Sequence, residues 1–103
     1  MQTIYTVEEI KEKITPALLD KGVTRVILFG SYSKGTATED SDIDLVVAVE
    51  DWVDIFDFSA LSIDVSTALG KRVDFLPLED IIPGGRADQE IKTTGRLLYE
   101  KVG

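Results

Sequence analysis

Hydrophobic residues recur along the chain with two different periods, and these periods predict its helices and strands. The first helix is predicted by four apolar residues at helical spacing: Val7, Ile10, Ile14 and Leu18. Thr6 followed by Glu9 is a capping box that would start this helix. Pro16 is expected to kink the helix or to split it near Thr15, and Gly22 is a stop signal.

The remaining pattern predicts alternating strands and helices. They are strands over 24–30 and 42–49, a helix over 53–70, a strand over 71–78 and a helix over 87–95. The face of the longer helix would consist of Phe58, Leu61, Val65 and Leu69. Gly70 would end that helix and Pro77 the strand after it. Residues 96–102 either continue the last helix or form a strand, and we favour the strand. The predicted fold class is a small α/β sandwich, with helices packed against a mixed β-sheet.

Composition narrows the chemistry open to such a fold. The chain has 103 residues, which suits a single domain over 1–103. It has no cysteine and no histidine, so thiolate, imidazole and zinc–sulfur chemistry are excluded. No apolar run is long enough for a membrane span, and the first residues lack the order of a signal peptide. We therefore expect a cytoplasmic protein without a membrane partner.

Negative charge is concentrated in the middle of the chain. The net charge is −8, and nine acidic residues but no basic ones lie between Lys34 and Lys71. Such a surface is unsuited to nucleic acid, so no direct contact with nucleic acid is expected. Most of these acidic residues are interpreted as solvated surface.

Asp42 and Asp44 are the exceptions, because they begin an apolar strand. Side chains alternate between the faces of a strand, so these two would share one face while Ile43 and Leu45 pack into the core. Two adjacent carboxylates repel each other unless a cation lies between them. Oxygen ligands of this kind favour Mg²⁺ or Mn²⁺.

Gly30-Ser31, where the preceding strand ends, is a candidate phosphate-binding turn. Glycine allows the backbone to approach a ligand, and the N–H groups of a turn or short helix starting at Ser31, together with its hydroxyl, could hold an anion. Lys34 could add positive charge near the phosphates.

Three other motifs do not fit this segment. A Walker A loop needs Gly-Lys-Ser/Thr, but Gly35 is followed by Thr36. Asp40, Asp42 and Asp44 imitate the start of an EF-hand, yet Leu45 occupies the position of its glycine. A Rossmann fingerprint is also missing.

The phrase VILFGSYSKGTATEDSDIDLVV, with Gly30-Ser31, ten residues and then Asp42-Ile43-Asp44, resembles the signature of DNA polymerase beta-like nucleotidyltransferases. Within that superfamily it is similar to the minimal nucleotidyltransferase (MNT) group, over nearly the whole chain. The resemblance implies a third carboxylate on the strand after the central helix. Asp74 fits that role, whereas Asp64 is in mid-helix and is better interpreted as solvated. The family often has arginine where this chain has Lys34.

The resemblance also implies two-metal transfer of a nucleoside monophosphate, expected to be AMP from ATP. Asp42 and Asp44 would hold one metal ion and share a second with Asp74, which could also act as a base. A hydroxyl would attack the α-phosphate and pyrophosphate would leave.

MNT proteins are often encoded beside a helical HEPN toxin and can adenylylate one of its tyrosines, so the resemblance implies an antitoxin with a HEPN-type partner. The acidic face, with Trp52 and Phe56 at its edge, could bind a basic partner; alternatively these aromatics close the core. Two other functions remain open. One is a non-catalytic nucleotide-binding module that neutralises its partner by contact, and the other is transfer to a small molecule.

Overall fold

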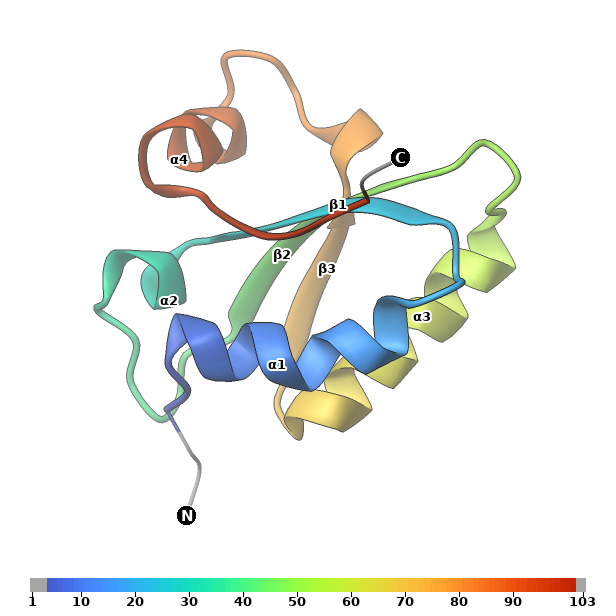
Figure 1. The fold of residues 1–103 in the computed structure, drawn as a ribbon. Coiled ribbons are helices and arrows are strands. Elements are labelled where there is room, and N and C mark those ends of the chain that lie inside the picture. The colour runs from blue at the N-terminus through green and yellow to red at the C-terminus, as the bar shows by residue number, and fades with distance from the viewer. Residues whose placement is uncertain (1–3, 102–103) are drawn as a thin grey trace.

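The computed structural model describes residues 4–101 of the chain, and its four strands form one mixed sheet in the order β3-β2-β1-β4 (Figure 1). Strand β1 is antiparallel to both β2 and β4, while β2 and β3 are parallel. This confirms the predicted mixed sheet with helices packed against it. In chain order the elements are α1 (Val7–Leu18), β1 (Val23–Phe29), α2 (Ser31–Lys34), β2 (Ile43–Val49), α3 (Ile55–Leu69), β3 (Val73–Pro77), the 3-10 helix η1 (Leu78–Asp80), α4 (Arg86–Thr94) and β4 (Arg96–Glu100).

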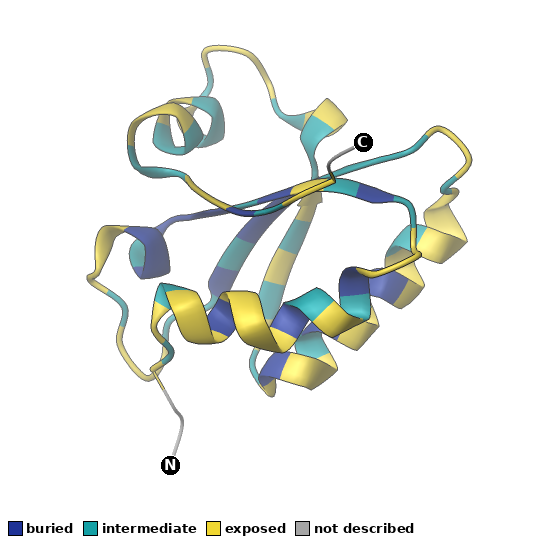
Figure 2. Ribbon diagram, in the orientation of Figure 1, coloured by how far each residue is buried: buried dark blue, intermediate teal, exposed yellow. Residues whose placement is uncertain are grey.

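The helices divide between the two faces of the sheet. Helices α1 and α3 lie side by side on one face, and α4 lies over the other (Figure 1). The core fills the α1/α3 side, where the inward faces of the helices and strands are buried (Figure 2). Its members include Ile10, Ile14, Leu28, Ile43, Leu45, Leu61, Val65 and Leu69. The α4 side combines buried apolar residues, Val46 and Phe29, with the polar groups of the site.

Helix α1 confirms the capping box, because Thr6 accepts from the Glu9 N–H and Glu9 accepts from the Thr6 N–H. The helix is continuous through Pro16 and ends at Leu18. The predicted split near Thr15 therefore does not occur. A proline in the last turn forfeits one N–H bond on the exposed side of the helix, and the buried side still packs.

Helix α3 begins at a second capping box, formed by Asp54 and Asp57, and ends at Gly70 in the left-handed conformation, as predicted. Residues 96–100 form the favoured strand, while Val102 of that prediction lies outside the described residues. In residues 4–101, no helix is both long and apolar enough to cross a membrane.

Trp52 and Phe56 do not close the core. They are 63% and 81% exposed, at the β2–α3 connection and in the first turn of α3. That alternative is wrong, because three other residues of α3 fill the core side of the helix: Leu61, Val65 and Leu69.

Candidate active site

Two of the predicted carboxylates meet where the parallel strands β2 and β3 begin. Asp44 is the register partner of Asp74 on β3 and of Phe29 on β1. Val73 and Phe75 pack against the core, so Asp74 lies on the opposite face of β3, as predicted. The β2–β3 pairing therefore brings together side chains that are far apart in the sequence.

The surroundings of Asp44 raise its pKa from the ordinary 3.8 to about 6. Partial burial is the largest cause, followed by a side-chain hydrogen bond with Asp74 and the negative charges of Asp74, Asp42 and Glu90. A cation next to Asp44 would stabilise its ionised form and lower its pKa. The pair thus has the electrostatic character of a cation-binding site.

Gly30 lies directly against this pair. It precedes α2 with φ of 75°, and a Cβ at this position would overlap Oδ2 of Asp44. Only glycine combines that backbone angle with that lack of a side chain. The contact of Gly30 with the Asp44 carboxylate was not predicted, and the predicted approach of Gly30 to a phosphate stays a prediction. Ser31 follows as the first residue of α2 and is partly exposed.

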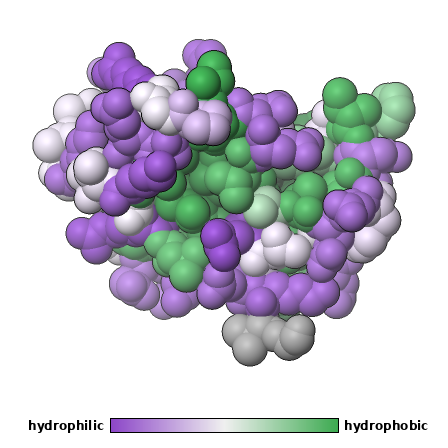
Figure 3. Space-filling view, turned by 90° about the horizontal axis from the view of Figure 1, so that it is seen from above, coloured by the Kyte–Doolittle hydropathy of each residue, from purple (hydrophilic) through white to green (hydrophobic). Residues whose placement is uncertain are grey.

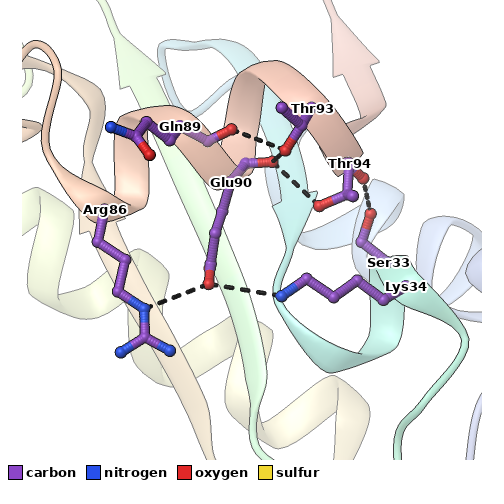
Figure 4. Close-up of polar contacts among 7 residues, drawn as sticks. All are labelled: Ser33, Lys34, Arg86, Gln89, Glu90, Thr93 and Thr94. Atoms are coloured by element: carbon purple, nitrogen blue, oxygen red, sulfur yellow. Dashed lines mark hydrogen bonds and ion pairs between the residues drawn. The ribbon is translucent and has the colours of Figure 1, made fainter.

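Lys34 points toward α4. Its Nζ lies 3.5 Å from Oε1 of Glu90, and the same oxygen lies 3.5 Å from Nε of Arg86 (Figure 4). One carboxylate thus serves two cations. Sequence reasoning missed Glu90 and Arg86, because only the pairing of β4 with β1 carries α4 over the site.

Helix α4 is also tied to α2 by uncharged groups. The Ser33 hydroxyl donates to the Thr94 carbonyl, and the Thr94 hydroxyl donates to the Glu90 carbonyl at 3.0 Å (Figure 4). Ser33 is itself buried. These bonds fix the end of α4 beside the turn that follows Gly30.

Asp42 directly precedes β2, and its charge contributes to the raised pKa of Asp44. Its Oδ2 is 3.9 Å from Nε of Arg72, whose side chain is largely exposed. Asp42 also borders an open polar pocket of about 430 Å³, which is lined by Asp40, Ser41, Asp42, Ser66, Thr67, Gly70, Lys71 and Arg72.

The donor set suits a divalent cation in chemistry, because it consists of carboxylates with no histidine or cysteine. Burial, the hydrogen bond with Asp74 and the neighbouring negative charges raise the pKa of Asp44, and a bound cation would oppose this rise. However, nowhere in residues 4–101 do three acidic side chains lie close enough together to hold a metal ion. The pairing of Asp44 with Asp74 is shown. Binding of metal ions by Asp42 together with these two residues stays a prediction. Asp64 is exposed on α3, on the other face of the sheet, which confirms its interpretation as a solvated residue.

A family model described as "Nucleotidyltransferase domain" matches residues 8–95. The chain belongs to the nucleotidyltransferase domain family. This nucleotidyltransferase is 40% identical over 77 residues to a Methanocaldococcus jannaschii protein named provisionally as a protein adenylyltransferase. The match covers 75% of this chain and 83% of that protein.

Two solved structures share the fold of this nucleotidyltransferase. One is a toxin–antitoxin with AMP-PNP, with a TM-score of 0.72 and 31% identity, covering 88% of this chain and 73% of that one. The other is the complex of tri-AMPylated Shewanella oneidensis HEPN toxin with MNT antitoxin, with a TM-score of 0.67 and 26% identity, covering 93% and 74%. The resemblance to minimal nucleotidyltransferases is therefore confirmed.

Proposed function

We propose that this nucleotidyltransferase is an antitoxin that transfers AMP from ATP to a tyrosine of a HEPN-type toxin. The observation that carries the proposal is the Asp44–Asp74 pair with Gly30 against it. The similarity to a toxin–antitoxin with AMP-PNP and to an AMPylated HEPN complex supports the donor and the acceptor. The whole chain over 1–103 is proposed to act as one domain, in the cytoplasm, where ATP is available.

Each predicted site residue has a role in this proposal. Asp42, Asp44 and Asp74 would hold Mg²⁺ or Mn²⁺, which supplies charge neutralisation and lowers the pKa of the attacking hydroxyl. Gly30 and Ser31 would bind the triphosphate through backbone N–H groups and the serine hydroxyl. Lys34, which pairs with Glu90 in this structure, would release Glu90 and bind the phosphates through its ammonium group.

The transfer itself conserves atoms and charge. The tyrosine oxygen forms a bond to the α-phosphorus, the bond from that phosphorus to the bridging oxygen breaks, and pyrophosphate leaves. The tyrosine proton passes to a carboxylate. Asp74 is the better placed acceptor, because it is more exposed than Asp44 and faces the same side of the sheet.

Apolar surface beside the carboxylates favours a protein as the acceptor. Seen from the α4 side, hydrophobic side chains gather in the middle of the molecule and hydrophilic ones surround them (Figure 3). Leu76 follows Asp74 on the same face of β3 and is 37% exposed, and Leu97 on β4 is 53% exposed. Exposed apolar surface of this kind is typical of protein contact sites.

The test is to incubate the chain with ATP, Mg²⁺ and its HEPN-type partner and to measure the partner's intact mass. The proposal predicts added mass in units of AMP, which Asp42→Asn and Asp44→Asn abolish. Neutralisation of the partner with no added mass would instead identify a contact inhibitor. AMP found on a small molecule would identify a different acceptor.

A further inference from the structure

We propose that Lys34 and Arg86 together form a binding site for the triphosphate of the donor nucleotide, and that Glu90 occupies this site until the nucleotide displaces it. The inference rests on the proposed nucleotidyl transfer but concerns only how the donor is bound. Its three residues come from α2 and α4.

Glu90 pairs with Lys34 and Arg86 at the same time. Its Oε1 lies 3.5 Å from both Lys34 Nζ and Arg86 Nε, between the two cations (Figure 4). An anionic oxygen shared by two cations occupies the position that a phosphate oxygen would take. Only 23% of the Glu90 side chain is exposed, whereas 93% of the Arg86 side chain is. Arg86 therefore has room to move with an arriving ligand.

The cluster of Lys34, Arg86 and Glu90 lies near the carboxylate pair. The Lys34 N–H donates to the carbonyl of Gly30 at 3.1 Å, and Gly30 lies against the Asp44 carboxylate, so the cluster is one helical turn from the pair. The charge of Glu90 also contributes to the raised pKa of Asp44. A nucleotide whose α-phosphate is beside Asp44 would extend its phosphates over the same region. In the absence of nucleotide, the carboxylate of Glu90 reduces repulsion between Lys34 and Arg86 but adds negative charge next to Asp44.

The two ion pairs of Glu90 are weak enough for a nucleotide to displace it. Both ion pairs are long, and Lys34 and Arg86 reach into solvent, so each contributes little to stability. A triphosphate carries several charges and offers many acceptor oxygens, and it can replace one carboxylate at both cations. Glu90 thus lowers the affinity for nucleotide without preventing binding.

The experiment measures affinity by calorimetry, using α,β-methylene-ATP, in which the bond that breaks in transfer is blocked. Glu90→Gln keeps the size of the side chain and removes its charge. We expect binding roughly tenfold tighter at low salt, with the gain shrinking as salt is added. Inorganic tripolyphosphate should show the same gain, while adenosine should show none.

Asp88→Asn is the matched control. Asp88 is on the same helix, pairs with Lys92 at 3.0 Å and loses the same charge on substitution. Affinity should stay within about twofold of the original, because this pair is separate from the Lys34–Arg86 cluster. Equal gains in both variants would mean a general charge effect and would overturn the proposal.

A second substitution tests the cations. Arg86→Met should weaken binding of tripolyphosphate more strongly in the Glu90→Gln chain than in the original, because Arg86 in the original must first leave Glu90. Additive effects, or weaker binding in Glu90→Gln alone, would overturn the proposal. Weaker binding of Mn²⁺ in Glu90→Gln would instead identify Glu90 as a metal ligand.

The original chain provides a measurement that needs no folded Glu90 variant. The Nε–H resonance of Arg86, assigned by its loss in Arg86→Met, should shift when tripolyphosphate is added. An unchanged resonance at saturation contradicts the proposal. Failure of AMP transfer is a separate outcome, because binding of tripolyphosphate requires no chemistry and no partner.

Discussion

The two faces of the β-sheet use alternate residues of the same strands and have opposite chemistry. On the α1/α3 face, Ile43 and Leu45 are fully buried in the core. Between them in the sequence, Asp44 faces α4 and pairs with Asp74. A substitution of Ile43 or Leu45 should therefore affect folding, whereas a substitution of Asp44 should affect the chemistry of the site. Apolar residues are also buried on the charged face, Val46 and Phe29 among them, but they lie outside the main core cluster.

The largest expected effect on the charged face is the loss of AMP transfer in Asp44→Asn. Asp44 would hold the metal ion that neutralises the developing charge, and loss of such stabilisation costs on the order of 10²- to 10³-fold in rate. Intact-mass measurement of the HEPN-type partner over time gives the rate. Asp64→Asn is the matched control, since Asp64 is exposed on α3 and should leave the rate within about twofold. Retention of more than about a tenth of the activity in Asp44→Asn would contradict this assignment.

The largest expected effect on the apolar face is the loss of stability in Leu45→Ala. Leu45 is fully buried, so its truncation should lower the free energy of unfolding by about 3 kcal/mol in urea denaturation. Leu76→Ala, the same change on the opposite face of the neighbouring strand, should cost under about 1 kcal/mol because Leu76 is partly exposed. Equal losses would show that the α4 face is packed as tightly as the core.

Gly30→Ala should lower both the stability of the fold and the rate of AMP transfer. The alanine must adopt the φ of 75° found at Gly30, and its Cβ must also displace the Asp44 carboxylate. We expect a loss of about 2 kcal/mol in unfolding free energy together with loss of transfer. Gly35→Ala separates the two causes, because Gly35 has a φ of 77° but nothing within 4 Å of a new Cβ. It should cost about 1 kcal/mol and leave transfer intact; equal behaviour of both variants would rule out the overlap.

The smallest expected effect is the pH dependence of stability without divalent metal. The folded pKa of Asp44 is about 6, above the ordinary 3.8, so the folded state binds more protons than the unfolded state between these values. The free energy of unfolding should therefore fall as pH rises from about 4 to 6, by about 1 kcal/mol after solvent screening of a half-buried group.

Urea denaturation of the original chain and of Asp44→Asn at several pH values, in the presence of a chelator, measures this contribution as the difference between the two curves. Asp44→Asn should lack it and be the more stable of the two at neutral pH. A difference that does not change with pH would indicate that Asp44 titrates near its ordinary value.

The apolar face could be predicted from the sequence because the spacing of residues within each helix or strand shows which of them are buried. Spacing along α3 identified Leu61, Val65 and Leu69, and the buried end of β2 identified its strand. Asp44 and Gly30 were also predicted, since the signature places them in one short segment. Each of these residues depends mainly on neighbours close in the chain.

The Glu90 cluster could not be predicted, because no local pattern distinguishes Glu90 from other acidic residues of an exposed helix. It becomes part of the site only when β4 pairs with β1 and Ser33 bonds to Thr94. Asp74 was predicted through family resemblance and alternation on its strand. The pairing of Asp74 with Asp44 depends on the parallel register of β2 and β3, which cannot be predicted from any single residue.

The parallel pairing of β2 and β3 has a consequence for the order in which the protein matures. Parallel strands need a crossover, here α3, so a nascent chain that ends within α3 has Gly30 and Asp44 but no second carboxylate beside them. Arg86 and Glu90, on α4, and strand β4 come later still in the chain. The proposed site is therefore complete only when both β3 and α4 are present, because Asp74, Arg86 and Glu90 all follow α3 in the chain.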